Sequence, residues 1–245
     1  MNRQFEALAR AASWRFLRGG IYPWQFAHWK LRLDPVFLAL LRNGHLPDRG
    51  RLVDVGCGQG VLLALLVTAR ERYRRGEWPQ EWAAPPLNLE LEGLERSRDR
   101  VWMARRALGE VAQVTRCDVR EAVLPRCTAI TLLDLLLYLE PADQRRLLEK
   151  AASALEPGGV LVLREADAAA GGLAYQVTRS IARFSAIGSG GLWPAVHCRS
   201  GPEWVSLLAA LGLSVAASEP MSAGTPFANV LLVARKPNAT TDKHR

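Results

Sequence analysis

The sequence predicts an α/β protein: a doubly wound sheet of seven strands, mostly parallel, with a C-terminal antiparallel hairpin and an N-terminal helical lid. Three observations predict it. A chain of 245 residues suits one α/β domain with a small appendage. The apolar run 52–55 ends in glycines at every second position and continues into helix-forming residues. Strand-like and helix-like segments then alternate, which produces right-handed crossovers and places ligands at the carboxyl ends of the strands.

The expected elements divide the chain into a lid (1–45), a main domain (46–236) with a cap insertion (168–200), and a disordered tail (237–245). Residues 74–86 have no periodicity and predict a surface insertion. Pro141 opens a helix whose apolar side chains share one face, and Pro157-Gly158-Gly159 ends it. The predicted strands are 52–55, 87–94, 111–116, 127–133, 160–163, 213–219 and 227–235, and the helices that follow the first, second and fifth are 61–73, 98–108 and 201–211.

The first 34 residues are rich in aromatic side chains, with arginines and Gly19-Gly20 between them. Two short amphipathic helices, about 3–17 and 23–31, fit this pattern. They could cover a sheet edge, form a lid over an acceptor pocket, or lie in a membrane interface, where Trp, Phe and Arg are favoured. The sequence leaves these three alternatives open.

Composition narrows the class of protein. The net charge of +8 permits contact with nucleic acid or an anionic membrane, although scattered solvated arginines explain it equally well. The four cysteines lie far apart without a C-x-x-C pair, so we expect neither a disulfide framework nor a metal site, and a reducing cytoplasm fits. No apolar run approaches the ~18 residues of a membrane span.

The glycine loop limits what can bind. Gly56, Gly58 and Gly60 let a ligand lie against the backbone, but Val61 stands where a dinucleotide fingerprint wants its last glycine. No Gly-Lys-Ser/Thr triplet follows, which argues against a P-loop. Asp54, two residues before the first glycine, is unfavourable for a pyrophosphate and favourable for an ammonium or sulfonium group.

The stretch Asp54-Val-Gly-Cys-Gly-Gln-Gly60 resembles motif I of the class I S-adenosylmethionine (SAM) methyltransferases, an acid followed by G-x-G-x-G. Asp134-Leu-Leu-Leu-Tyr-Leu-Glu-Pro141 resembles motif IV of the small-molecule members, and a weaker similarity extends to bacterial polyene-pigment and polyketide-pathway enzymes. The resemblance covers about 50–236. It implies a Rossmann-like fold and SAM as the cofactor, bound by Asp54, Gly56, Cys57, Gly58, Gly60, Glu95, Arg96, Asp118, Val119 and Asp134.

Individual roles follow from position. Glu95 ends the second strand and can accept hydrogen bonds from both ribose hydroxyls, or it can be a solvated strand-end charge. In the resembled family an acid at the place of Asp118 binds the adenine amino group and the next amide, here of Val119, binds a ring nitrogen; otherwise Asp118 caps a turn. Cys57 is expected to be a small filler of the loop.

Methyl transfer is an in-line displacement, so correct positioning of the two reactants does most of the work. An acceptor that is a neutral phenol or acid can need a base to remove its proton. Tyr138, Glu165, Asp167 and His197 are the candidates. His197 titrates near neutrality and is the candidate base, unless it is a loop histidine without chemistry. Glu165 could contact the acceptor or pair with Arg164, and Tyr138 could line the donor pocket.

The favoured activity is methylation of an oxygen or carbon atom on a small aromatic or lipid-like acceptor, free or attached to a carrier or membrane. Methyltransferases that act on amino groups of nucleic acids carry an N-P-P-Tyr or D-P-P-Tyr loop, which is missing here after the fourth strand. Aromatic residues such as Tyr175, Phe184 and Trp193 could form the wall of an apolar pocket. The alternatives are an RNA methyltransferase that uses the basic surface, and a non-catalytic SAM-fold interaction module.

Overall fold

The computed structural model describes residues 3–171, 176, 180, 195–222, 225 and 227–238. Most of the predicted cap insertion, with Tyr175, Phe184 and Trp193, and most of the tail lie outside the described residues. One sheet of seven strands crosses the molecule in the order β3-β2-β1-β4-β5-β7-β6. Its strands are β1 Arg49–Val55, β2 Asn88–Glu95, β3 Gln113–Arg116, β4 Cys127–Leu133, β5 Leu155–Ala166, β6 Ser214–Pro220 and β7 Asn229–Arg235.

The pairing confirms the predicted sheet. β1 to β5 are parallel to one another, whereas β7 lies antiparallel between β5 and β6. Because successive side chains of a strand point to opposite faces, β1 sends Leu52 into one core and Val53 into the other. Strands buried on both faces read as continuous apolar runs, which is why Cys127–Leu133 could be placed correctly from the sequence.

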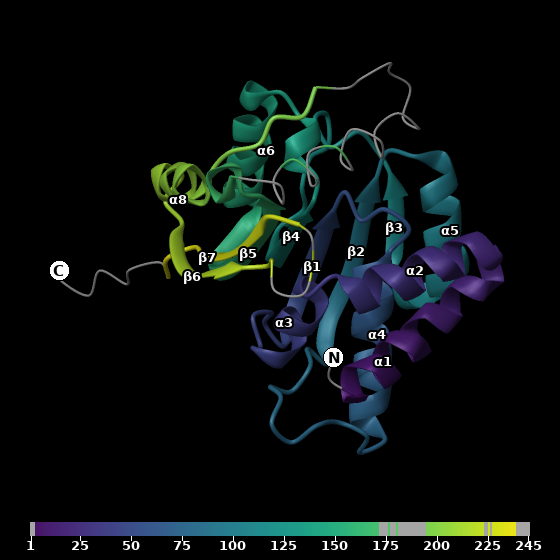
Figure 1. Ribbon diagram of the computed structural model, residues 1–245. Coiled ribbons are helices and arrows are strands. Elements are labelled where there is room, and N and C mark those ends of the chain that lie inside the picture. The colour runs from purple at the N-terminus through teal and green to yellow at the C-terminus, as the bar shows by residue number, and fades with distance from the viewer. Residues whose placement is uncertain are drawn as a thin grey trace.

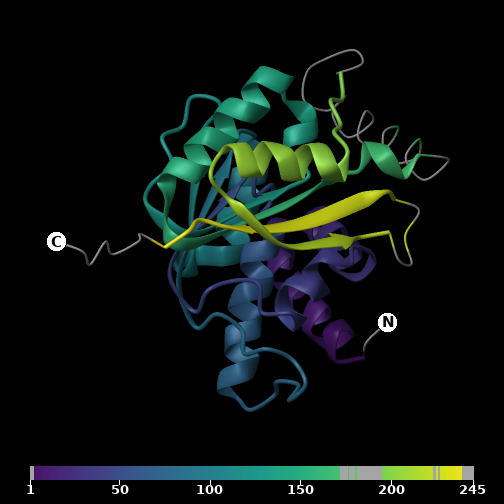
Figure 2. The ribbon, with the colours of Figure 1, turned by 90° about the vertical axis from the view of Figure 1, so that its left-hand side faces the viewer.

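Helices cover both faces of the sheet, as Figures 1 and 2 show. The N-terminal helices pack with α4 and α5 on one face, and α6 and α8 cover the other. The helices are α1 Arg3–Trp14, α2 Ile21–Leu33, α3 Val36–Arg42, α4 Val61–Arg74, α5 Arg98–Leu108, α6 Pro141–Ala154 and α8 Gly201–Ala210. No helix in the described part of the chain is long and apolar enough to cross a membrane.

The N-terminal segment is a docked layer of the fold. Phe5, Leu8 and Phe16 are buried in the same core as α4. The first predicted helix ends at Trp14, and a 3₁₀ turn, Arg15–Gly19, follows it. The loop after α4 contributes to this layer, since Trp82 is buried with its ring 6.3 Å from that of Phe5. Residues 75–86 therefore lack regular secondary structure, as predicted, but the prediction of a surface insertion was wrong for Trp82, which packs in the core.

Candidate functional site

The glycine loop connects β1 to α4 at the carboxyl edge of the sheet. Gly56, Gly58 and Gly60 have φ angles of 76°, 57° and 82°, a region that only glycine adopts without strain. The amides of Gly56 and Cys57 donate to the Leu94 carbonyl at 2.8 and 3.0 Å, which holds the loop against β2.

The three glycines have different reasons for lacking a side chain. A Cβ on Gly56 would lie 2.9 Å from Leu135, and one on Gly60 would lie 2.9 Å from Leu108. A Cβ on Gly58 would meet no protein atom within 4 Å. The loop therefore leaves open space beside the backbone at Gly58, and this is the observation that fits a ligand lying against the loop.

Glu95 is directly tied to this loop. Its Oε2 accepts a hydrogen bond from the Gly58 amide at 3.0 Å, and its Oε1 accepts from the Ser97 amide at 2.7 Å. The residue is buried at the end of β2, while the neighbouring Arg96 is exposed. Because each carboxylate oxygen has a second lone pair, Glu95 can hold the loop and still accept from a ligand hydroxyl.

Asp54 is buried between β1 and β4. Thr131 Oγ1 donates to its Oδ1 at 2.7 Å. Burial, with a smaller effect of the nearby Glu95 carboxylate, raises the pKa of Asp54 to about 7, against the lowering effect of the Thr131 hydrogen bond. The carboxyl is thus poised to ionise when a cation arrives, which suits the ammonium or sulfonium partner predicted for it.

Cys57 packs inside the loop. A Cβ on Gly93 of β2 would lie 2.7 Å from the Cys57 Sγ, so the thiol occupies the space that a side chain at position 93 would fill. Burial raises the thiol pKa well above its ordinary value, and the Asp54 and Glu95 charges raise it further. A thiol that resists ionisation is a poor nucleophile, in agreement with the filler role expected for Cys57.

Asp118 follows β3 on the same edge. It accepts hydrogen bonds from the Arg120 side chain, the shorter at 2.6 Å, and from the Arg120 amide at 3.0 Å. The Arg120 side-chain hydrogen bond lowers the pKa of Asp118 to about 2. Asp118 therefore caps its own turn in this structure, next to the buried Val119, and its contact with adenine stays a prediction.

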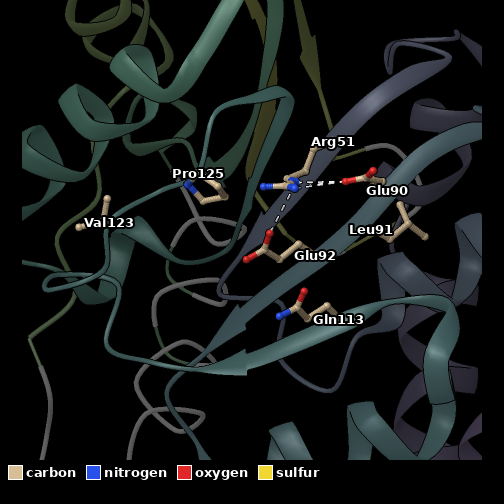
Figure 3. Close-up of a pocket in the computed structure, with 7 residues that line it drawn as sticks. All are labelled: Arg51, Glu90, Leu91, Glu92, Gln113, Val123 and Pro125. Atoms are coloured by element: carbon tan, nitrogen blue, oxygen red, sulfur yellow. Dashed lines mark hydrogen bonds and ion pairs between the residues drawn. The ribbon is translucent and has the colours of Figure 1, made fainter.

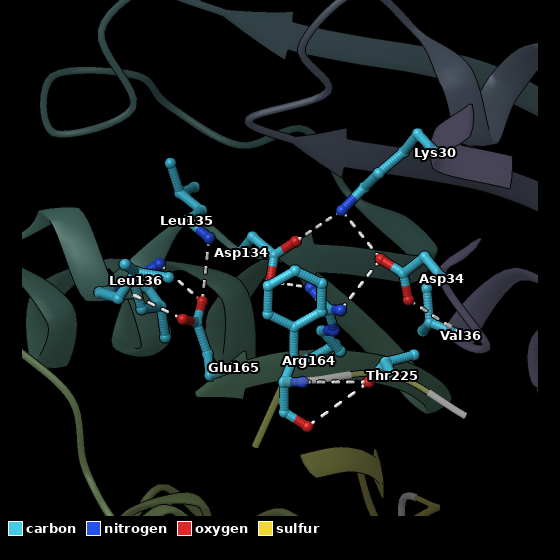
Figure 4. A network of polar contacts seen from close by, with 11 residues as sticks. Lys30, Asp34, Val36, Asp134, Leu135, Leu136, Arg164, Glu165 and Thr225 are labelled. Atoms are coloured by element: carbon cyan, nitrogen blue, oxygen red, sulfur yellow. Dashed lines mark hydrogen bonds and ion pairs between the residues drawn. The ribbon is translucent and has the colours of Figure 1, made fainter. Parts of the chain in front are cut away.

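A network of charges joins α2 to the ends of β4 and β5 (Figure 4). Lys30 Nζ lies 2.8 Å from Asp34 Oδ2 and 2.9 Å from Asp134 Oδ2. Arg164 pairs with the same two carboxylates, at 2.9 Å from Asp34. Burial disfavours the charge on Asp134, but Arg164 and Lys30 outweigh it and lower the pKa of Asp134 to about 2.

Asp134 also has an unusual backbone. Its φ of 57° makes it the sole non-glycine residue with positive φ in the described part of the chain. Strain of this kind concentrates at functional sites, where the surrounding structure enforces it. The network explains what holds Asp134 in place, and its predicted contact with the cofactor remains to be tested.

Glu165 is fully buried at the end of β5 and faces the turn that follows Asp134. Its carboxylate accepts hydrogen bonds from the amides of Leu135, Leu136 and Leu137 at 3.0, 2.7 and 3.2 Å. Burial and the Asp134 charge raise the pKa of Glu165 to about 8, against the opposing effect of these three amides. The structure thus places Glu165 as a support of the turn, not paired with Arg164, and its catalytic role stays a prediction.

Tyr138 and His197 lie together at the outer end of this turn. The His197 amide donates to the Leu137 carbonyl at 2.9 Å, and the His197 Nε2 lies 3.3 Å from Glu140 Oε2. Burial, together with the Asp134 and Glu165 charges, raises the pKa of Tyr138 to about 12, so its phenol is neutral at physiological pH. Asp167 instead caps α8, accepting from the Gly201 amide at 3.0 Å.

Gln144 organises this region and was not anticipated from the sequence. Its Nε2 donates to the carbonyls of Leu136, Leu139 and His197 at 3.0, 3.2 and 2.9 Å. Its Oε1 accepts from the Arg199 side chain at 2.8 Å. The available signal was an amide at position 144 on the apolar face of the helix, three and four residues before Leu147 and Leu148.

A separate hollow of about 470 Å³ lies where β1, β2 and β3 begin (Figure 3). Arg51 reaches Glu90 at 3.2 Å and Glu92 at 3.9 Å across it. Its lining includes none of the residues at the carboxyl ends of β1, β2 and β3, and open α/β sheets bind their ligands at the carboxyl ends. The charges in it are paired with one another, so we assign the functional site to the opposite edge.

The fold and the acids along this edge define the class: a doubly wound domain of the kind that binds SAM for methyl transfer. Comparison with known proteins agrees. The family described as a methyltransferase domain matches residues 26–197, well over half of the chain. The chain therefore belongs to this methyltransferase family, as its resemblance predicted, and SAM is the cofactor of the class.

Curated relatives share part of the chain. The carboxy-S-adenosyl-L-methionine synthase of Chromohalobacter salexigens is 32% identical over 133 residues, which cover 52% of this chain and 44% of that protein. The corresponding synthase of Aliivibrio salmonicida is 40% identical over 133 residues, or 52% of this chain and 49% of that protein. The chain spans about half the length of the curated relatives it matches.

Solved structures share the fold. The methyltransferase SibL superimposes with a TM-score of 0.63 at 20% identity, covering 89% of this chain and 58% of that one. Human N-acetylserotonin methyltransferase in complex with SAM gives 0.60 at 16% identity, covering 97% and 60%. Magnesium protoporphyrin IX methyltransferase from Synechocystis PCC 6803 with bound SAH gives 0.57 at 18% identity, covering 84% and 82%.

Proposed function

We propose that this protein binds SAM at the glycine loop and transfers its methyl group to an oxygen or carbon atom of a small aromatic or lipid-like acceptor. The open space beside Gly58, with the Glu95 carboxylate at its edge, carries the proposal. A sulfonium cofactor supplies the methyl group when bound, and its cationic end suits the buried Asp54 carboxyl, whose pKa of about 7 lets it ionise on demand.

The chain's own contribution to the reaction is positioning. Asp134 and the turn behind it are fixed by Arg164, Glu165 and Gln144, so the acceptor would meet a rigid surface. Tyr138 and His197 border this surface, and His197 is the candidate base. An acceptor that already carries a nucleophilic carbon or oxygen anion would need no base.

Calorimetric titration with S-adenosylhomocysteine (SAH) tests cofactor binding directly. We expect Asp54→Ala and Glu95→Ala each to weaken SAH binding by about 1–3 kcal/mol, because each leaves polar groups of the site without a partner. A variant of an exposed acid that lies away from this edge, Glu149→Ala, is the control and should bind as the wild type does. Unchanged affinity in both site variants would show that the site lies elsewhere.

The acceptor class is tested with methyl-labelled SAM and a fractionated cell extract. Label in the fraction extracted by organic solvent supports the proposed aromatic or lipid-like acceptor. Label in RNA, together with an affinity of the protein for RNA that falls strongly as the salt concentration rises, would instead favour the RNA methyltransferase alternative. SAH binding without transfer to any fraction would favour the non-catalytic module.

The names of the curated relatives favour a second candidate. These relatives are named for the synthesis of carboxy-S-adenosyl-L-methionine, a carboxylated form of SAM. The analogous activity here would change the cofactor and leave no methylated acceptor. Mass spectrometry of SAM recovered after incubation with extract distinguishes the two: a carboxylated SAM product supports the second candidate, and SAH supports methyl transfer.

A further inference from the structure

Helix α2 is apolar on two faces. Pro23, Ala27 and Leu31 face the core, as their burial shows. Tyr22, Phe26, Trp29 and Leu33 are 69%, 46%, 55% and 60% exposed. Spacings of four, three and four residues place these four side chains along one face of the helix, which we call the α2 stripe.

The exposed apolar surface of the described residues is concentrated here. Seven of its twelve exposed large apolar side chains lie between positions 14 and 33: Trp14, Leu17, Ile21 and the four of the α2 stripe. With roughly half of each aromatic side chain exposed, the three aromatic members alone offer on the order of 300 Å². The largest apolar patch of a typical monomer has this size and is often functional.

The shape of the surface argues against a small ligand. Small-molecule sites are concave and bury most of their ligand, whereas the α2 stripe runs along the outside of a helix. The hollow in Figure 3 lies on β1, β2 and β3 and includes no α2 residue. A broad partner fits this surface better than a metabolite does.

The charge around the α2 stripe indicates an anionic partner. The first 34 residues carry six basic side chains and two acidic ones, which accounts for half of the net charge of the chain. Arg10 and Arg18 are exposed, whereas the Arg32 guanidinium, 5.9 Å from the centre of the Trp29 ring, is already paired with Glu6 at 3.2 Å. Exposed Trp, Tyr and Phe beside arginines is the composition of helices that lie in the interface of an anionic bilayer.

We propose that the α2 stripe docks this protein on the surface of an anionic lipid bilayer. The rings enter the headgroup region, and the exposed Arg10 and Arg18 of the same N-terminal segment pair with lipid phosphates. Bilayer binding of this kind needs no membrane-spanning helix.

Docking would also orient the candidate site. Lys30 follows Phe26 by four residues and precedes Leu33 by three, so it projects from the edge of the α2 stripe, and it reaches Asp134 at 2.9 Å. At the other end of the helix the Gln59 amide group donates to the Pro23 carbonyl at 2.9 Å, which ties α2 to the glycine loop. The carboxyl edge of the sheet therefore lies beside the bilayer, and this step, which rests on the proposed function, favours an acceptor held in lipid.

Co-sedimentation of the full chain with vesicles tests the proposal without any enzymatic assay. We expect binding to phosphatidylcholine vesicles that contain phosphatidylglycerol, weaker binding to phosphatidylcholine alone, and weakening by salt. The variant Tyr22→Ser/Phe26→Ser/Trp29→Ser should bind the anionic vesicles roughly tenfold less tightly, because affinity scales with the apolar area buried. Thermal unfolding and SAH titration verify that the variant is folded.

A matched control is available on α5. Trp102 is 52% exposed and has the Arg106 guanidinium 5.5 Å from its ring centre, as Trp29 has Arg32, but it lies outside the α2 stripe. Trp29→Ser should weaken vesicle binding and Trp102→Ser should not. Equal effects of the two, or no binding by the wild type, would overturn the proposal.

Other occupants of the surface give different results. If the α2 stripe joins two copies of the chain, sedimentation velocity shows a dimer that the triple variant dissociates, and vesicles do not bind; this outcome also overturns the proposal. SAH binding by a wild-type protein that ignores vesicles would refute membrane docking and leave the proposed function intact. Vesicle binding by a wild-type protein that does not bind SAH would refute the proposed function and leave membrane docking intact.

Discussion

Alanine at Gly58 separates ligand contact from packing in the glycine loop. Alanine at Gly56 or Gly60 would press against Leu135 or Leu108 at 2.9 Å, so a loss of binding there could come from a distorted fold. A methyl group at position 58 meets no protein atom within 4 Å and enters only the space assigned to the cofactor. The other cost of Gly58→Ala is backbone strain, because alanine at position 58 would be held at the φ of 57° that Gly58 has.

The size of both effects can be stated. A left-handed conformation costs a residue with a side chain about 1 kcal/mol, which lowers the Tm of a chain of this length by roughly 2–4 °C. Gly76, at the far end of α4, has φ of 74° and also no neighbour within 4 Å, so Gly76→Ala should lose a similar amount of stability. Only Gly58→Ala should lose SAH affinity, by at least about tenfold, because the backbone can no longer approach the ligand.

The assay is calorimetric titration with SAH on the wild type and both variants, with thermal unfolding in parallel. Similar Tm values for the two variants, with binding lost only in Gly58→Ala, would support a cofactor at this loop. If Gly58→Ala binds SAH as tightly as Gly76→Ala does, the open space beside the loop is not the cofactor site and the proposed function loses its basis.

Three further predictions concern the supports of the site. Arg164→Met should lower the free energy of unfolding in urea by about 3–5 kcal/mol, because Asp34 and Asp134 lose a buried partner, whereas the exposed Arg146→Met should change it by less than about 0.5 kcal/mol; equal losses would contradict this. Because the folded pKa of Asp54 is raised to about 7, its contribution to stability is complete below about pH 4 and is lost as the pH rises to about 7. In Asp54→Asn, the free energy of unfolding should therefore fall less between about pH 4 and pH 7 than it does in the wild type. Parallel plots of unfolding free energy against pH for the variant and the wild type would refute the raised pKa. Gln144→Leu should speed amide hydrogen exchange in residues 136–139, since three carbonyls lose their donor, and an unchanged exchange rate there would show that Gln144 is dispensable.

Local patterns predicted the kinds of element and their order, but the fifth strand was predicted too short. Pro157-Gly158-Gly159, predicted to end the preceding helix, lies within β5. The helix predicted over 98–108 is α5 at its observed bounds, where Ser97 is its N-cap, and continuous apolarity placed β4 at its own. The first helix was predicted too long: residues 15–17 form a 3₁₀ turn, because Arg15 turns toward Thr68 and Glu71 of α4. A contact between residues more than fifty positions apart leaves no trace in local periodicity.

The candidate site divides in the same way. Asp54, the three glycines, Glu95 and Asp134 could be placed at one edge because parallel strands deliver their carboxyl ends together. Which partner each acid takes was not visible, since Glu165 could equally have paired with Arg164 or faced an acceptor. The structure turns Glu165 to three backbone amides and gives Arg164 to Asp34 and Asp134.

The sequence by itself determined the family, the order of strands and helices, and the loop whose glycines admit a ligand. These follow from short-range spacing: apolar periodicity, glycines two residues apart, and acids at the ends of strands. Only the tertiary structure decided that Lys30 and Asp34 belong to the candidate site and that α2 turns a second apolar face outward. The partner of a charge and the exposed side of a helix depend on which elements pack together, and that is a property of the folded chain.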